Sequence, residues 1–268
     1  MYNSFYGFAK NPFDKQQVTE DDHFVSQDFE QMTSRLNYLK DIRGIGLFTA
    51  PPGMGKSYCL RCFLNSLHPN DSITSYVPLS TVSVAEFYKQ LCGILGVRDR
   101  GGKTTMFKAI QEQIRHLYSV KRTPLILALD EAQCLSTGVL NDLKMLMNFG
   151  CDSLNCFTLI LCGEPYLNDT LDKPIHEALR QRITIHYNYQ GLSDDEIAAY
   201  LMHKIHIGGA AESIIDNAAI SVIHSYSKGN ARLIDNVMTD AITIGAQNNK
   251  KVIDAAVIQL AIENQRLG

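Results

Sequence analysis

The chain has 268 residues, of which 45% are hydrophobic, and this is enough apolar material for one sizeable α/β core and a smaller lobe. Its net charge of −3 and pI of about 6.2 exclude a whole-chain electrostatic preference for nucleic acid or anionic membrane, so any DNA contact must use a local basic patch. No apolar run is long enough to span a bilayer, and the seven cysteines, an odd number, indicate reduced thiols in a cytoplasmic protein without membrane contact.

The N-terminal segment, residues 1–43, is rich in aromatic and turn-forming residues. Phe5-Tyr6-Gly7-Phe8 is followed by the turn sequence Asn11-Pro12-Phe13. A helical pattern then extends from about Phe29 to Asp41. We therefore expect a strap that packs against the core, followed by a helix.

Residues 47–57 read Leu-Phe-Thr-Ala-Pro-Pro-Gly-Met-Gly-Lys-Ser and predict a phosphate-binding loop between a strand and a helix. The helix start directs unpaired backbone N–H groups and a positive dipole end at an anion, and glycines let the backbone approach it closely. Lys56 is expected to reach the β- and γ-phosphates, and the Ser57 hydroxyl to hold Mg²⁺. Ala50 stands where the usual pattern has glycine, at a position that shapes the turn. The predicted nucleotide-binding residues here are Pro52, Gly53, Met54, Gly55, Lys56, Ser57 and Tyr58.

A basic loop lies further along the chain, at residues 98–103. Gly101 and Gly102 give its backbone freedom, and its cations suit contacts to a phosphate backbone that do not read the bases. The alternative is an ordinary solvated charged loop. The candidate DNA contacts are Arg98, Arg100 and Lys103.

The apolar run Leu125–Leu129 predicts a strand that is buried on both faces, and Asp130 and Glu131 follow it directly. Ligands of open α/β sheets bind at the carboxyl ends of the strands, so this acidic pair should face the same ligand as Lys56. We expect Asp130 to hold Mg²⁺, directly or through water. Glu131 is expected to orient and deprotonate the water that attacks the γ-phosphate.

Strand-like apolar runs alternate with helical patterns throughout residues 44–190, which predicts a parallel sheet covered by helices. The expected strands are 46–50, 75–78, 125–129, 158–162 and 183–187. The expected helices are 56–67, 84–95, 105–118, 139–149 and 176–181.

Two charged features belong to the end of this region. Glu164 follows the strand 158–162 and is a candidate γ-phosphate sensor, although a carboxylate there would repel the phosphate. Arg180 and Arg182 precede the last strand, where an arginine in a ring or filament of NTPase subunits can stabilise transition-state charge in a neighbour's site. The alternative is a pair of surface arginines at a helix C-terminus.

Residues 191–268 show helical patterns only, near 193–207, 216–226, 230–246 and 254–264. The first of these begins with a capping box, Ser193 to Glu196. We expect a small helical lid. Arg232, in the first turn of the third helix, either reaches the γ-phosphate from the same subunit or is an ordinary solvated arginine.

Lys56, Asp130-Glu131, Arg182 and Arg232 follow the order of the AAA+ ATPases, which the chain resembles over nearly its whole length. The opening segment is similar to the start of ExeA-type general-secretion ATPases, and transposition helpers of the MuB, IstB and TnsC kind are close relatives. The resemblance implies an α/β P-loop NTPase fold with three layers around a parallel sheet and a C-terminal helical lid, and it implies ATP and Mg²⁺ as cofactors. It also implies that Arg182 is the arginine finger, Arg232 the lid sensor and Lys103 a DNA contact.

ExeA-type proteins continue into a membrane span and a peptidoglycan-binding domain, whereas this sequence ends after the predicted lid, which favours the transposition helpers. We therefore expect an Mg²⁺-dependent ATPase that forms homo-oligomers, as a ring or helical filament, on double-stranded DNA and recruits or regulates a DDE-type transposase. The alternatives are a secretion-assembly ATPase, a helicase loader or replication-initiation protein, and a nucleotide switch that does not hydrolyse ATP.

Overall fold

The computed structural model describes residues 2–14, 22–78, 81–150, 153–210 and 214–265, which form two compact units. The core unit comprises residues 31–52 and 56–189. The helical unit comprises residues 1–30, 53–55 and 190–268. Residues 1–30 and 53–55 thus group with the C-terminal helices, which the order of the segments in the sequence does not indicate.

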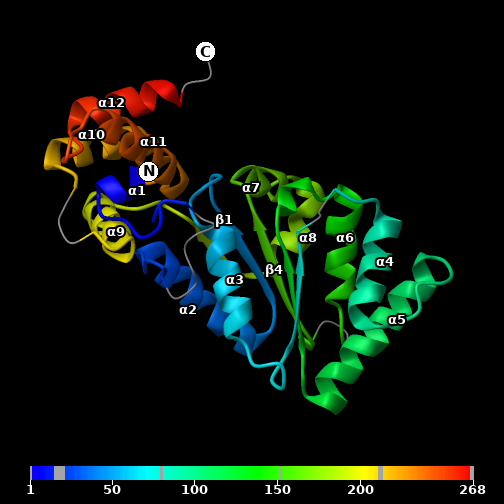
Figure 1. The fold of residues 1–268 in the computed structure, drawn as a ribbon. Coiled ribbons are helices and arrows are strands. Elements are labelled where there is room, and N and C mark those ends of the chain that lie inside the picture. Colours follow the sequence, from blue (N-terminus) through cyan, green and yellow to red (C-terminus); the bar gives the residue numbers. More distant parts are fainter. Residues whose placement is uncertain (1, 15–21, 79–80, 151–152, 211–213, 266–268) are drawn as a thin grey trace. The chain divides into compact units, whose positions relative to one another are not determined.

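A parallel five-stranded sheet, in the order β2-β3-β4-β1-β5, forms the centre of the core unit (Figure 1). The central strands are buried along their whole length, as their uninterrupted apolar runs require, whereas the two edge strands are partly exposed. The prediction of a parallel sheet is confirmed, although β2 begins and ends earlier than predicted. The strands are β1 (Ile45–Thr49), β2 (Ile73–Val77), β3 (Leu125–Leu129), β4 (Thr158–Gly163) and β5 (Ile183–Asn188).

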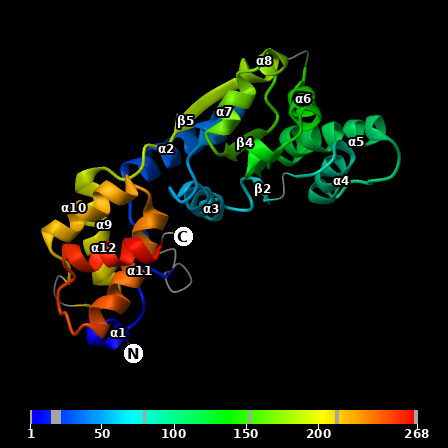
Figure 2. The same cartoon turned by 90° about the horizontal axis from the view of Figure 1, so that it is seen from above.

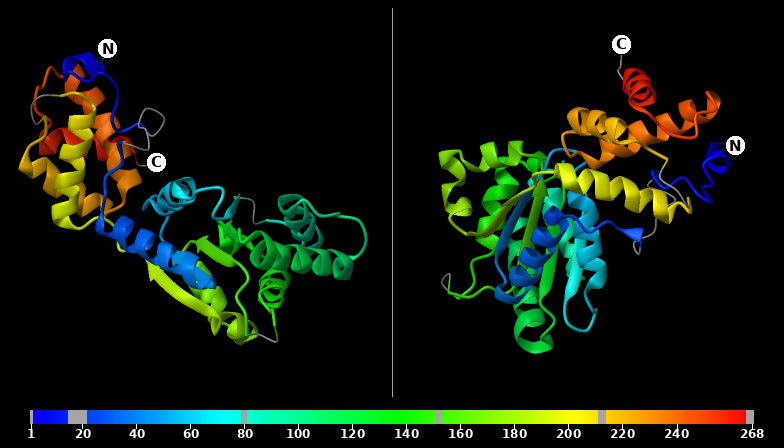
Figure 3. Two further views of the ribbon diagram at one scale, coloured as in Figure 1. Left: turned by 90° about the horizontal axis from the view of Figure 1, so that it is seen from below. Right: turned by 90° about the vertical axis from the view of Figure 1, so that its left-hand side faces the viewer.

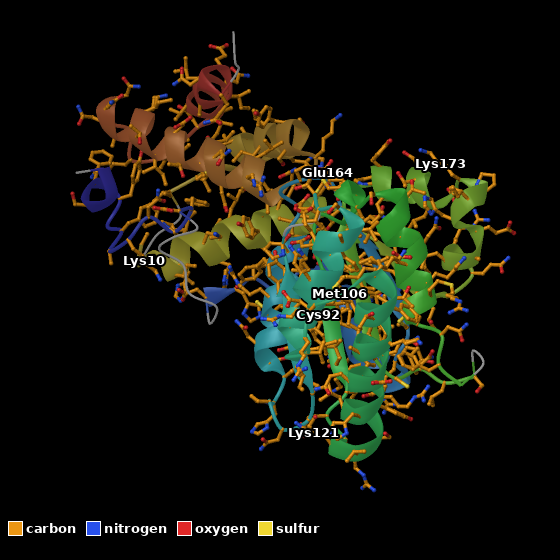
Figure 4. All side chains as sticks on the ribbon, turned by 90° about the vertical axis from the view of Figure 1, so that its right-hand side faces the viewer. Lys10, Cys92, Met106, Lys121, Glu164 and Lys173 are labelled. Carbon is orange, nitrogen blue, oxygen red and sulfur yellow. The ribbon has the colours of Figure 1, made fainter. Side chains whose placement is uncertain are left out.

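Helices cover this sheet, and α4, α5 and α6 lie side by side in Figures 1 and 2. Cys92 on α4 and Met106 on α5, both labelled in Figure 4, are buried in one apolar cluster together with residues of the sheet. Helix α7 was not predicted, because six residues are too few to show a helical period. The helices are α2 (Gln27–Ile42), which begins in the helical unit, α3 (Lys56–Ser66), α4 (Val84–Leu95), α5 (Lys103–His116), α6 (Thr137–Leu146), α7 (Tyr166–Leu171) and α8 (Glu177–Arg180).

The helical unit has its own apolar core, formed by the C-terminal helices and the N-terminal aromatic residues. Its capping box at Ser193 and Glu196 is present as predicted. Figure 3 shows the N-terminal segment running among these helices. The helices are α1 (Tyr2–Phe5), α9 (Asp194–Ile207), α10 (Asn217–Ser227), α11 (Ala231–Gln247) and α12 (Ala255–Asn264).

We expected the strap to pack against the core; its described part belongs to the helical unit. Tyr6, Phe8 and Phe13 are buried there among side chains of the C-terminal helices. Two glycines leave the necessary room: a Cβ at Gly208 would lie 2.7 Å from the Phe8 ring, and a Cβ at Gly245 would collide with the Tyr6 hydroxyl. None of the described helices combines the length and the apolar character that crossing a membrane requires.

Candidate nucleotide-binding site

The carboxyl ends of β1, β3 and β4 meet at one edge of the sheet. Thr49 at the end of β1 pairs with Gly163 at the end of β4, and Leu129 at the end of β3 pairs with Leu161. Glu164 marks this edge in Figure 4, and Lys121 lies at the opposite end of the core unit. The chain leaves the neighbouring strands β1 and β4 in opposite directions across the sheet, toward β2 and toward β5. Such a point in an open α/β sheet is a preferred ligand site.

The structure brings Lys56 and Asp130 together at this edge. The Lys56 Nζ lies 2.7 Å from Asp130 Oδ1, and the two side chains are only 8% and 3% exposed. Lys56 Nζ also lies 3.5 Å from the hydroxyl of Ser57, an exposed residue. Burial alone would raise the pKa of the Asp130 carboxyl, but the hydrogen bond and charge of Lys56, with further hydrogen bonds, hold that pKa below its ordinary value.

Asp130 has further partners on both carboxylate oxygens. The Glu131 backbone N–H donates to Oδ1 at 2.9 Å, and the Tyr76 hydroxyl donates to Oδ2 at 2.9 Å. Burial, and then the hydrogen bond to Asp130, raise the pKa of Tyr76 to about 12, so its hydroxyl stays protonated and donating at neutral pH. The sequence analysis missed Tyr76, which lies on the edge strand β2 and gives no signal of its own.

Glu131 is exposed and has a left-handed backbone conformation, with φ of 52°. Its carboxylate accepts a hydrogen bond of 2.6 Å from the side-chain amide of Gln133. The amide oxygen of Gln133 in turn accepts the backbone N–H of Glu164 at 3.1 Å. Gln133 therefore links Glu131 to the backbone of Glu164 and not to its carboxylate. Gln133 was not among the residues predicted from the sequence.

Two glycines of the predicted phosphate loop adopt positive φ, 91° at Gly53 and 96° at Gly55. Within the helical unit, Gly53 accepts the Arg232 backbone N–H at 3.2 Å, and a Cβ at Gly53 would lie 2.7 Å from the Cβ of Arg232. A Cβ at Gly55 would meet nothing within 4 Å, so the space beside Gly55 is open. Both positions therefore favour glycine, and Gly53 has a packing reason as well.

The remaining residues predicted to bind nucleotide in this loop are Pro52, Met54 and Tyr58. Pro52 is exposed and Met54 is partly exposed. The Tyr58 ring lies 5.2 Å from the Arg61 guanidinium carbon. The structure does not assign a ligand contact to Pro52, Met54 or Tyr58, and their roles stay predictions.

The residues at this edge fit a magnesium–nucleotide complex. Ser57 and Asp130 offer hydroxyl and carboxylate oxygens, which are the ligand types that Mg²⁺ prefers. No cluster of three or more His, Cys, Asp or Glu residues that could hold a metal occurs in the described part of the chain. Mg²⁺ sites commonly use one or two protein oxygens and take their other ligands from phosphate and water.

The predicted arginine finger lies away from this edge. Arg182 donates from Nη1 to the backbone oxygen of Lys144 on α6 at 3.1 Å, and its side chain is partly exposed. Arg180 is exposed and pairs with Asp172 at 3.0 Å. The first contact orients the Arg182 guanidinium from within the same chain.

The candidate DNA contacts differ among themselves. Arg98 and Arg100 are exposed in the loop before α5. Lys103, by contrast, forms an ion pair of 2.6 Å with Asp142 on α6. This ion pair ties the Lys103 side chain to α6, and its role as a phosphate contact stays a prediction.

Comparison with known proteins agrees with this geometry. Residues 40–171 match the protein family described as "AAA domain". General secretion pathway protein A from Aeromonas hydrophila is 28% identical over 272 residues, an alignment that covers 98% of this chain and 48% of that protein. The chain thus spans about half the length of this relative.

Solved structures with a similar fold come from several proteins. Cdc6p from Pyrobaculum aerophilum has a TM-score of 0.69 at 18% identity, covering 96% of this chain and 71% of that one. The Aeropyrum pernix ORC1 protein in complex with DNA has a TM-score of 0.65 at 13% identity, covering 96% and 69%. The Thermotoga maritima RuvB Holliday junction branch migration motor has 0.61 at 15% identity, covering 97% and 74%. The chain thus has the α/β P-loop fold of AAA+ proteins that the sequence predicts.

Proposed function

We propose that this protein binds ATP with Mg²⁺ and hydrolyses it to ADP and phosphate. The observation that carries the proposal is the buried ion pair of Lys56 and Asp130 at 2.7 Å. A buried ion pair contributes little net stability, because desolvation offsets the attraction, so folding alone does not explain the pair. A phosphate-binding lysine beside a metal-binding carboxylate explains it.

Each residue has a defined role in this proposal. The backbone N–H groups of Gly53–Ser57 and the Lys56 ammonium bind the phosphate oxygens. Ser57 and Asp130 would hold Mg²⁺, which neutralises charge on the phosphates when it is bound. Glu131, exposed at the tip of β3, orients the attacking water and accepts its proton at the carboxylate.

Two arginines complete the proposed machinery. Arg232 acts as the lid sensor of the γ-phosphate, supported by its backbone contact to Gly53. Arg182 acts on the nucleotide of a neighbouring subunit, supported by its partial exposure and its fixed direction. This role requires a homo-oligomer, either a ring or a filament.

Binding and turnover assays test the ATPase proposal. Lys56→Ala should lose ATP binding, whereas Glu131→Gln should bind ATP and hydrolyse it only at a low residual rate. Normal ATP affinity in Lys56→Ala would refute the assignment of the loop. Full turnover in Glu131→Gln would refute the role of the carboxylate. If Glu131→Gln retains the cellular function although turnover is lost, the protein is a nucleotide switch.

We further propose two settings for this ATPase. In the first, the protein oligomerises on double-stranded DNA and recruits or regulates a DDE-type transposase, with the exposed Arg98 and Arg100 as phosphate contacts. In the second, it serves the assembly of a secretion system, which the name of the Aeromonas hydrophila relative supports. A cytoplasmic location, favoured by the odd number of cysteines, belongs to both settings.

DNA binding separates the two settings. The double variant Arg98→Glu/Arg100→Glu should weaken binding to duplexes of any sequence. It should also reduce the slope of log K against log salt by about 2, at about 0.9 per phosphate contact. The control is Lys121→Glu, because Lys121 lies at the far end of the core unit from the nucleotide edge (Figure 4). A wild-type protein that binds no duplex DNA at low salt, with or without ATP, would refute the first setting.

A further inference from the structure

Gln133 occupies the short 3₁₀ turn η3 (Ala132–Cys134) directly after the acidic pair of β3. Its side-chain amide has partners at both ends. The nitrogen donates to Glu131 Oε2 at 2.6 Å, and the oxygen accepts the Glu164 backbone N–H at 3.1 Å. The side chain thereby joins the tip of β3 to the tip of β4.

The two partners determine which way the amide points. With the amide reversed, its oxygen would face the Glu131 carboxylate and its NH₂ group would face the Glu164 N–H. Both contacts would be repulsive, because a carboxylate only accepts hydrogen bonds and an N–H only donates. The bridge therefore requires a group that donates on one side and accepts on the other, which glutamine provides and glutamate in its charged form does not.

The end of β4 leaves room for this bridge. A Cβ at Gly163 would lie 2.7 Å from the Gln133 amide oxygen and 2.9 Å from the Leu167 side chain. Gly163 is not among the residues with positive φ, so its backbone does not require glycine. The reason for a glycine at this position is the space that Gln133 and Leu167 occupy.

The residue that Gln133 holds would otherwise be poorly restrained. Glu131 is exposed, so its carboxylate is not enclosed by the surrounding protein. A general base must hold a set direction toward the water that it deprotonates, and losing that direction costs rate rather than ground-state binding. Glu164 has a carboxylate, which would repel a phosphate at this strand tip. Gln133 places a neutral amide against the same strand tip.

We propose that Gln133 is a positioning residue for hydrolysis. Its amide fixes the direction of the Glu131 carboxylate and ties it to the tip of β4 through the Glu164 backbone N–H. This inference rests on the proposed ATPase function, because it concerns the base of that reaction. It predicts an effect on turnover that is transmitted through Glu131.

The first test observes the bridge without nucleotide. In protein with ¹⁵N-labelled glutamine, the Gln133 side-chain NH₂ signals are assigned by their absence in Gln133→Leu. We expect one of the two amide protons to be shifted downfield, and the shift to be lost in Glu131→Ala. Gln133 signals that do not move when Glu131 is replaced would overturn the inference, whether or not the protein hydrolyses ATP.

The second test measures turnover and ATP affinity separately. Gln133→Leu should lower kcat at least about 10-fold, with Kd for ATP within about 3-fold of wild type. Gln133→Glu keeps the size but loses the donor and adds a like charge, so it should lower kcat as well. The matched control is Gln265→Leu, which removes an amide-to-carboxylate hydrogen bond to Asp240 in the helical unit and should leave kcat unchanged.

A double-variant comparison separates positioning from a general structural effect. In the Glu131→Gln background, Gln133→Leu should cause no further loss of the residual turnover, because it acts through a base that is already absent. A full additional 10-fold loss there, or an unchanged kcat in Gln133→Leu alone, would overturn the inference. A wild-type protein without any ATP turnover would refute the proposed function instead, and the amide signals would still decide whether the bridge exists.

Discussion

Lys56→Met is the most informative single change, because it keeps most of the aliphatic side chain and removes only the ammonium that faces Asp130. The paired side chains are 8% and 3% exposed, so the variant leaves a carboxylate that is buried and has lost its counter-charge. Removing one partner of a buried pair costs about 3–5 kcal/mol. The Tyr76 hydroxyl and the Glu131 N–H still donate to Asp130, so we expect the lower end, about 3 kcal/mol.

The pH dependence of this difference follows from the lowered pKa of Asp130. A carboxyl whose folded pKa lies below its unfolded value stabilises the fold above the unfolded pKa, and this stabilisation is lost as the pH falls through the folded pKa. The gap between variant and wild type should therefore be largest at neutral pH and shrink in acid. The double variant Lys56→Met/Asp130→Asn should recover most of the loss at neutral pH, because no buried charge remains.

Urea unfolding measures this loss of stability, and hydrogen exchange of peptides that contain β3 assigns it to the core unit. The same experiment with ATP and Mg²⁺ at 100 times Kd should stabilise the wild type by about 2.7 kcal/mol and Lys56→Met by none. If Lys56→Met unfolds within about 1 kcal/mol of wild type and gains as much from ATP, the reasoning about the buried pair and about the phosphate loop is refuted.

Three further predictions concern other parts of the chain. Burial, opposed by Lys204 and a tyrosine hydroxyl, raises the pKa of Asp235 from 3.8 to about 6. Its contribution to the free energy of unfolding is therefore full below pH 3.8 and is lost as the pH rises through about 6, a fall of about 3 kcal/mol. Urea midpoints measured from pH 4 to 8 should show this fall in wild type, and a flatter pH dependence in Asp235→Asn. Arg182→Ala mixed with Lys56→Met, each inactive alone, should regain part of the ATP turnover if the arginine acts on a neighbour; no gain on mixing would count against that role. Gly163→Ala should cost about 1–3 kcal/mol in urea unfolding and lower kcat as Gln133→Leu does, and an unaffected kcat would argue against the bridge.

The parts of the fold that the sequence predicts best are those with strong local patterns. β3 and β4 are buried on both faces, so only uninterrupted apolar runs can form them, and such runs are visible in the sequence. β2 is an edge strand whose residues alternate between more and less exposed, so its bounds were less clear. α7 lies between Glu164-Pro165 and a further turn, and it is too short for a period to be recognised.

The packing partner of the strap could not be predicted for a different reason. The aromatic residues Tyr6, Phe8 and Phe13 indicate burial, but burial does not specify the surface that provides it. The residues that make room for these aromatic side chains, Gly208 and Gly245, lie some 200 residues further along the chain. Glycines at these positions have no visible link to the N-terminus until the chain is folded.

The site residues likewise divide into those that a local sequence motif predicts and those that only the folded structure brings together. Lys56 lies in a glycine-rich loop before a helix, and Asp130 follows a buried strand; both motifs are visible in the sequence. Because ligands of open α/β sheets bind at the carboxyl ends of the strands, the sequence also predicts that the two residues meet. Tyr76 and Gln133 depend on the order of the strands, which alternation along the chain does not provide. Tyr76 reaches Asp130 because β2 lies beside β3, and Gln133 reaches Glu164 because β4 lies on the other side of β3. A sheet order with β1 in place of β4 beside β3 would keep both motifs and lose the contact between Gln133 and Glu164, so this contact carries information about the site that only the fold supplies.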